Sequence, residues 1–196
     1  MVIGPGVERG GHETLIRECD ERDIPAILEV INDAAQAYRG VIPADRWKEP
    51  YMPEEELREE LAAGVAFIAY VEAGKVQGVV GLQDVADVSL IRHAYVRRAW
   101  QGRGVGTALL AALRARTARP LLIGTWRAAT WAIRFYERRG FRLVPAERAP
   151  TLLRRYWTVP ERQIETSVVL ADDRWATRAG SNLDAPACTG SSTSVR

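Results

Sequence analysis

Three alternating glycines placed directly before an amphipathic stretch constrain the fold of this chain more than any other feature. The glycines are Gly102, Gly104 and Gly106. Apolar residues follow at spacings of three and four, which is one face of a helix: Val105, Ala108, Leu109, Ala112 and Leu113. Residues 85–96, before the glycines, are rich in β-branched residues and predict a strand. A strand that enters a helix through a glycine turn indicates a sheet with helices packed on it.

The rest of the chain repeats this alternation of strands and helices. Further strands are expected at 14–19, 65–71, 76–82, 121–123, 141–144 and 164–170, and helices at 21–38, 53–63 and 129–139. Residues 73–75 join 65–71 and 76–82 as a hairpin, whereas two prolines mark 40–51 as a loop. An early hairpin followed by alternating strands and helices predicts an α/β (α+β) domain, with a mixed central sheet flanked by helices on both faces.

Composition predicts one domain with polar ends. Residues 1–12 are glycine-rich and are expected to be a flexible leader, and the small polar residues of 176–196 predict a disordered tail, which leaves a domain over 13–175. No apolar run approaches the roughly 18–20 residues of a membrane span, and no secretory signal is visible, so we expect a cytoplasmic protein without a membrane partner. Two distant cysteines and two histidines disfavour a disulfide framework and a metal site.

Charge is distributed very unevenly along the chain. Residues 1–87 hold 18 acids and 8 bases, whereas 88–136 hold nine arginines and no acid, although the whole chain has a net charge of only +2. A stretch without carboxylates favours binding of a polyanion, either nucleic acid or a small phosphorylated cofactor, and accidental clustering of surface arginines is the alternative. No helix-turn-helix, zinc-finger or RNP signature is present, so we expect no specific nucleic-acid partner.

The glycine loop suits a phosphate ligand. Alternating glycines can turn several backbone N–H groups into one concavity at the start of a helix, and Arg103 adds positive charge. A P-loop would need a lysine, and the dinucleotide fingerprint would need its last glycine one position later than Gly106. A glycine-rich turn that binds nothing remains the other interpretation of the loop.

Two segments together resemble the GNAT superfamily of acetyl-CoA-dependent N-acetyltransferases. Residues 101–106 are QGRGVG and match the family's cofactor motif, Gln/Arg-x-x-Gly-x-Gly/Ala, and Val96 takes the preceding strand-end position. Residues 132–141 are AIRFYERRGF and match the second motif, Ala-x-x-Phe-Tyr-x-x-x-Gly-Phe. The resemblance covers about 15–144 and departs from the family at Ala129, where members often carry an asparagine that contacts the pantetheine arm.

The resemblance implies acetyl-CoA as the cosubstrate and assigns the residues that bind it. These are Tyr95, Val96, Gln101, Gly102, Arg103, Gly104, Val105, Gly106 and Thr107. The loop N–H groups would hold the pyrophosphate, and the Val96 backbone N–H would polarise the thioester carbonyl. Tyr136 matches the family tyrosine near the sulfur, which makes it the candidate general acid for the thiolate, because an ordinary pKa of about 10 keeps a tyrosine protonated at neutral pH.

The implied reaction moves an acetyl group to the primary amine of a small molecule, and its base is not evident. His93 lies on the cofactor strand and is the first candidate, or else a structural histidine, and strand alternation turns it to the face opposite Val96. Weaker candidates are Glu49, Asp84, Asp87 and Glu165, and expected acceptor-pocket walls are Tyr38, Trp47, Tyr51, Trp126 and Trp157. The acidic N-terminal half favours a cationic acceptor.

A catalytically weak CoA-binding module of the same fold is the alternative function, and it would bind the cofactor without turnover. Because dimers are common in the family, the resemblance also allows a homodimer.

Overall fold

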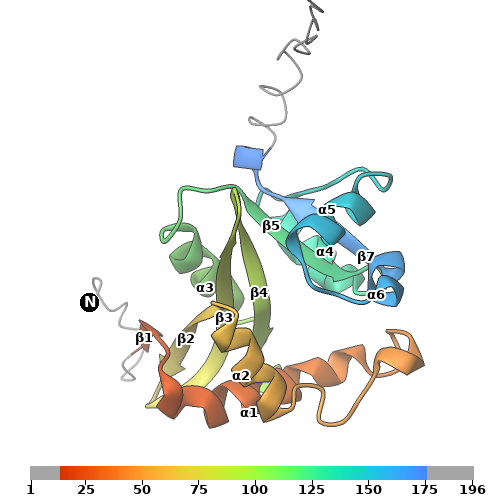
Figure 1. Cartoon of the computed structure of the whole chain (residues 1–196). Helices are drawn as coiled ribbons and strands as arrows, with labels where there is room; N and C mark the ends of the chain where they lie inside the picture. Colours follow the sequence, from red (N-terminus) through yellow and green to blue (C-terminus); the bar gives the residue numbers. More distant parts are fainter. Residues whose placement is uncertain (1–13, 176–196) are drawn as a thin grey trace, which may run out of the picture.

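A seven-stranded sheet in the order β1-β2-β3-β4-β5-β7-β6 forms the centre of the molecule (Figure 1). The structure is a computed structural model that describes residues 14–175, so the expected leader and tail lie outside the described residues. The strands are β1 (Thr14–Glu18), β2 (Ala66–Glu72), β3 (Lys75–Val85), β4 (Val88–Val96), β5 (Leu121–Trp126), β6 (Arg142–Leu143) and β7 (Ser167–Ala171). Among these seven strands of residues 14–175, only β4 and β5 pair in parallel, which makes the sheet mixed, as expected.

Helices cover both faces of this sheet, which confirms the predicted architecture. The α-helices are α1 (Ile24–Ala35), α2 (Glu54–Ala62), α3 (Val105–Arg114), α4 (Thr130–Glu137), α5 (Ala149–Tyr156) and α6 (Glu161–Thr166). Short 3-10 turns are η1 (Glu21–Asp23), η2 (Gln36–Tyr38), η3 (Ala44–Arg46) and η4 (Arg98–Trp100). Residues of α3 and α4 pack on one face, and those of α1, α2, α5 and α6 pack on the other.

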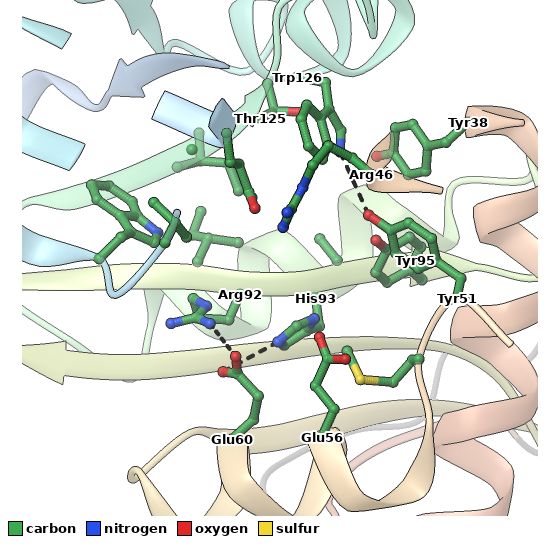
Figure 2. A pocket seen from close by; sticks show the side chains of 18 of the residues that line it. Tyr38, Arg46, Tyr51, Glu56, Glu60, Arg92, His93, Tyr95, Thr125 and Trp126 are labelled. Carbon is green, nitrogen blue, oxygen red and sulfur yellow. Dashed lines mark hydrogen bonds and ion pairs between the residues drawn. The ribbon is translucent and has the colours of Figure 1, made fainter. Parts of the chain in front are cut away.

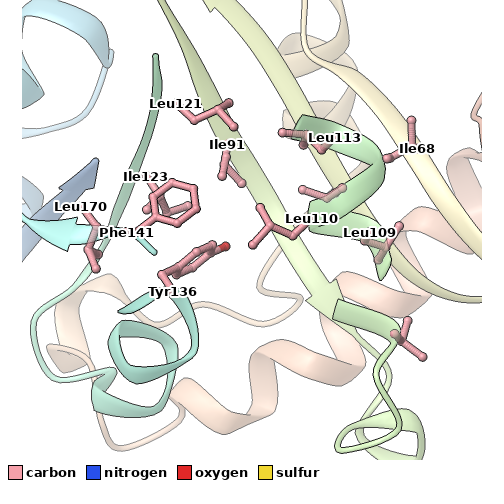
Figure 3. Packing of buried hydrophobic residues seen from close by; sticks show 12 residues of the cluster. Ile68, Ile91, Leu109, Leu110, Leu113, Leu121, Ile123, Tyr136, Phe141 and Leu170 are labelled. Atoms are coloured by element: carbon pink, nitrogen blue, oxygen red, sulfur yellow. The ribbon is translucent and has the colours of Figure 1, made fainter. Parts of the chain in front are cut away.

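Helix α3 fixes the position of the glycine loop. Leu109, Leu110 and Leu113 of α3 are buried against strand residues that include Ile68 and Ile91 (Figure 3). The helix also lies very close to β3, since a Cβ added at Gly78 would stand only 2.8 Å from Val105 Cγ1. This close packing fixes the position of the start of α3 relative to β3, and therefore the position of the glycine loop before it.

Two expected strand boundaries were wrong, and one helix was not expected. The strand expected over 85–96 is interrupted, because β3 ends at Val85 and a tight turn at Ala86 (φ 50°) leads into β4. The strand expected over 164–170 begins only at Ser167, since residues 164–166 complete α6. No helix was expected between the strands at 141–144 and 164–170, yet this arginine-containing segment forms α5. Its apolar side is buried on the sheet, namely Ala149, Leu152, Leu153 and Tyr156.

A bulge in β4 separates this strand from β5. Arg92 pairs with Gly81 and Tyr95 pairs with Val79, so two residues of β4, His93 and Ala94, oppose one residue of β3. His93 has a φ of 48°, which a residue with a side chain rarely adopts. Bulges bend the strand that carries them. Accordingly, the β4–β5 pairing ends at Ile91 and Ile123, and the two strands diverge (Figure 1).

Candidate functional site

The gap between β4 and β5 opens into two cavities. One, of about 620 Å³, is lined by the glycine loop, and we call it the loop cavity. The other, of about 670 Å³, is lined by Glu55, Glu56, Glu59 and Glu60 of α2, and we call it the acidic cavity. Six residues line both of them: Tyr38, Ile91, Ala94, Tyr95, Ala132 and Tyr136. Two ligands that enter from different sides can therefore meet in the gap.

The loop cavity has the features of an anion site. Gly102 and Gly104 adopt left-handed φ values of 77° and 88°, and a Cβ added to either would meet nothing within 4 Å. Gly104 is the N-cap of α3 and has no side chain, so the first N–H groups of that helix receive no side-chain cap. Unsatisfied N–H groups at a helix start, with open space before them, fit the diphosphate of a nucleotide carrier.

Two arginines of the turn after α4 also reach the loop cavity. Arg138 and Arg139 line it, and Arg139 Nε donates to Thr107 Oγ1 at 3.1 Å while its guanidinium lies over the Phe135 ring. These two arginines were not singled out from the sequence, although they lie within the second motif. Arg103, which was, lies over the Trp100 ring and is not among the residues that line the cavity.

The backbone of Val96 faces the gap. The Arg97 N–H donates to Gln77 O at 2.9 Å, so Arg97 is turned toward β3. Successive backbone groups alternate along an antiparallel ladder, which turns the N–H and C=O of Val96 away from β3. Gln101 Nε2 donates to Val96 O at 3.1 Å on that side. The Val96 N–H therefore points toward the side where β5 has diverged.

Tyr136 extends from α4 between the two cavities. Its ring is 5% exposed and makes edge-to-face contacts with Phe135 and Phe141. Figure 3 shows its hydroxyl turned toward β4 and α3. Burial raises the pKa of Tyr136 above its ordinary value of 10.0, so this phenol stays protonated across the physiological range.

His93 and Glu60 form a close pair in the acidic cavity (Figure 2). His93 Nε2 lies 3.3 Å from Glu60 Oε2, in an orientation that gives neither buried atom a hydrogen bond with a described residue. Arg92 Nη2 donates to the other Glu60 oxygen at 2.5 Å. Burial alone would raise the pKa of Glu60, but the contacts with His93 and Arg92 outweigh it and hold the pKa below its usual value. His93 lies on the α2 face and Val96 on the α3 face, as alternation predicted.

The other residues expected at the acceptor side divide between cavity and scaffold. Tyr38, Tyr51, Trp126 and Trp157 line the acidic cavity, whereas Trp47 packs behind Tyr51. The four weaker base candidates line neither cavity: Glu49, Asp84, Asp87 and Glu165. Ala129, which replaces the family asparagine, is fully buried at the start of α4.

The arginine-rich stretch over 88–136 is partly neutralised within the fold. Five of its nine arginines form ion pairs with acids of residues 1–87: Arg92 with Glu60, Arg97 with Glu29, Arg98 with Asp33, Arg116 with Glu18 and Arg119 with Asp84. The uneven charge along the sequence therefore reflects in part pairing between its two parts. This finding weakens the interpretation of the whole stretch as a polyanion-binding surface.

The tyrosines between the cavities predict a loss of stability at alkaline pH. Burial raises the pKa of Tyr38, Tyr95 and Tyr136 above the ordinary value of 10.0. Because the unfolded chain loses these protons first, their stabilisation is complete below pH 10 and is lost as the pH rises further. We expect the urea midpoint to fall above about pH 10, and to fall less steeply in Tyr136→Phe. An equally steep fall in the variant would contradict this assignment.

Comparison with known proteins agrees with the geometry of the site. Residues 29–151 match the family described as "Acetyltransferase (GNAT) domain". No curated protein matches the chain. Within residues 14–175, no helix has the length and apolar character to cross a membrane, and no cluster of three metal-ligating side chains is present.

Several solved structures share the fold at low sequence identity. The PaiA N-acetyltransferase of Thermoplasma acidophilum, in complex with coenzyme A, has a TM-score of 0.61 and 15% identity over 81% of this chain and 98% of its own. A GNAT-family acetyltransferase of Staphylococcus aureus has a TM-score of 0.61 and 16% identity, over 82% of this chain and 99% of its own. The ribosomal-protein-S18-alanine N-acetyltransferase of Escherichia coli has a TM-score of 0.58 and 20% identity, over 81% of this chain and 92% of its own. The family match and the shared fold agree, and the chain belongs to the GNAT acetyltransferase family.

Proposed function

We propose that this protein is an N-acetyltransferase that moves the acetyl group of acetyl-CoA to a primary amine of a small molecule. The observation that carries the proposal is the meeting of the two cavities in the β4–β5 gap, where Tyr95 and Tyr136 line both. One cavity ends at uncapped N–H groups suited to a diphosphate, and the other is bordered by acids suited to a cationic amine.

The loop cavity would hold acetyl-CoA. The N–H groups of residues 102–107 would bind the pyrophosphate, with Arg138 and Arg139 adding charge-assisted contacts. The Val96 N–H, turned into the gap, would donate to the thioester carbonyl, where negative charge develops as the amine attacks. No asparagine side chain assists at position 129, so the backbone carries more of the binding.

Two side chains would move the protons of the reaction. The acceptor ammonium must lose a proton before its nitrogen attacks, and His93 is our candidate to take it. His93 Nε2 lies 3.3 Å from Glu60 Oε2, so Nδ1 is the nitrogen that would accept the proton. As the carbon–sulfur bond breaks, Tyr136 would donate its proton to the departing thiolate.

Thiol release from acetyl-CoA, measured with and without a panel of amines, tests this function. We expect release only when both acetyl-CoA and a suitable amine are present, and we expect acetyl-CoA alone to raise the melting temperature. Binding without release over the whole panel would instead support the CoA-binding module. Absence of both binding and release would overturn the proposal.

A further inference from the structure

An arginine without a partner lies in the acidic cavity. Arg46, at the end of η3, lines this cavity, and its guanidinium forms no hydrogen bond or ion pair with any residue of the described range 14–175. Its Nε is buried. Figure 2 shows the side chain passing between Thr125 and Tyr51 toward His93. The charge is thus directed into the space that the proposed acceptor would occupy.

The other cations of the cavity are already neutralised. Lys48 pairs with Glu56, and Arg92 pairs with Glu60. Although the α2 glutamates line the same cavity, none of them lies within ion-pair distance of Arg46. A partly buried guanidinium whose Nε has lost water and gained no acceptor is unfavourable unless an anion is supplied. No acid of residues 14–175 supplies this anion, which leaves the site open to the anionic group of a ligand.

The segment that carries Arg46 is held in place before any ligand arrives. Asn32 of α1 binds the backbone of Met52 twice, with Nδ2 donating to the carbonyl at 3.0 Å and Oδ1 accepting from the N–H at 2.8 Å. On the other side, the neighbouring Asp45 lies 3.5 Å from Arg162 of α6. Apolar packing of Ile42 against Trp126 fixes the middle of the segment on β5. Arg46 is therefore presented from a supported loop.

We propose that Arg46 binds a carboxylate of the acceptor, so that the substrate class is amines that carry a carboxylate, such as free amino acids. The inference rests on the proposed function and names the acceptor of the same site. A guanidinium matches a carboxylate with two parallel hydrogen bonds. The α2 glutamates disfavour a more highly charged anion such as a phosphate, because Glu55 and Glu59 are exposed along the same cavity.

The test compares amino acids with amines that lack the carboxylate. Thiol release would be measured with L-leucine, L-phenylalanine and L-tyrosine and with the amine obtained by removing the α-carboxyl group of each, for the parent and for Arg46→Gln. We expect the parent to prefer the amino acids, and Arg46→Gln to lose about 10- to 100-fold in kcat/KM toward them, the loss typical of a charged hydrogen-bonded pair. Toward the decarboxylated amines we expect less than about a threefold change.

Two controls separate this effect from loss of fold or of the proposed function. Arg58→Gln removes an exposed arginine that pairs with Glu54 and lines neither cavity, so it should behave as the parent. Arg46→Lys keeps the charge but loses the planar fork, and it should retain part of the preference. Calorimetric titration of the same six compounds in the presence of coenzyme A gives the comparison without turnover.

The outcomes are distinct. Equal use of both acceptor sets by the parent, an equal loss toward both in Arg46→Gln, or no calorimetric binding of any amino acid would overturn the carboxylate assignment. Turnover of amines without carboxylates would at the same time leave the proposed acetyl transfer standing. Failure of acetyl-CoA to bind at all would instead reject the proposed function.

Discussion

Gly104→Val is expected to lower the affinity for acetyl-CoA by at least about 100-fold, because two or more charge-assisted hydrogen bonds would be lost. Gly104 has a φ of 88° and starts α3 at the mouth of the loop cavity. A valine there is strained in the left-handed region, and its branched side chain fills open space through which a diphosphate would approach the N–H groups. Isothermal titration with acetyl-CoA measures the loss.

Gly64→Val is the matched control for this variant. Gly64 has nearly the same φ, 90°, and the same open surroundings, but it lines neither cavity. Each substitution should lower the free energy of unfolding by about 1–3 kcal/mol through backbone strain. Only Gly104→Val should lose acetyl-CoA. If both variants bind acetyl-CoA as the parent does, the loop is a turn without a ligand.

Tyr136→Phe is expected to lower kcat by about 10²- to 10⁴-fold, the range associated with loss of a general acid. The hydroxyl makes no hydrogen bond with another residue of 14–175, and the aromatic contacts with Phe135 and Phe141 do not need it. We therefore expect the melting temperature and the KM for acetyl-CoA to change little. Steady-state kinetics at fixed amine and varied acetyl-CoA separate the two parameters.

Tyr156→Phe provides the comparison with another buried tyrosine. Its hydroxyl donates to Asp87 at 2.8 Å, outside both cavities. The variant should lose about 1 kcal/mol of stability with that hydrogen bond and keep its kcat. A kcat for Tyr136→Phe within threefold of the parent, about 0.7 kcal/mol, would assign Tyr136 to packing alone.

Most of the fold could be predicted because most of its helices and strands have a recognisable pattern within their own residues. The stripe of α3 and the glycine loop are periodic or compositional signals, and both lie where expected. The turn at Ala86 carries no glycine or proline, so the strands on either side of it are continuous in pattern. Helix α5 was not predicted because arginines interrupt its apolar pattern, although Leu152, Leu153 and Tyr156 do follow a helical spacing.

The loop side of the candidate site was easier to predict than the acceptor side. Gly102 to Thr107 are consecutive in the chain, so one motif contains them. Arg46, Glu60 and His93 come from a 3-10 turn, a helix and a strand, and only the fold brings them to one cavity. No local pattern marks Arg46 or Glu60. Their significance follows from partners that they have or lack, which a linear sequence does not display.

The site depends on the extra residue in the β4 bulge as well as on its side chains. His93 and Ala94 occupy the space of a single residue opposite β3, and beyond them β4 no longer follows β5. Removing Ala94 would restore a regular register with β3 and allow the parallel ladder to continue past Ile91 and Ile123. A single-codon deletion or insertion at position 94 could thus close or open the passage for both substrates, with the candidate catalytic residues His93 and Tyr136 still encoded.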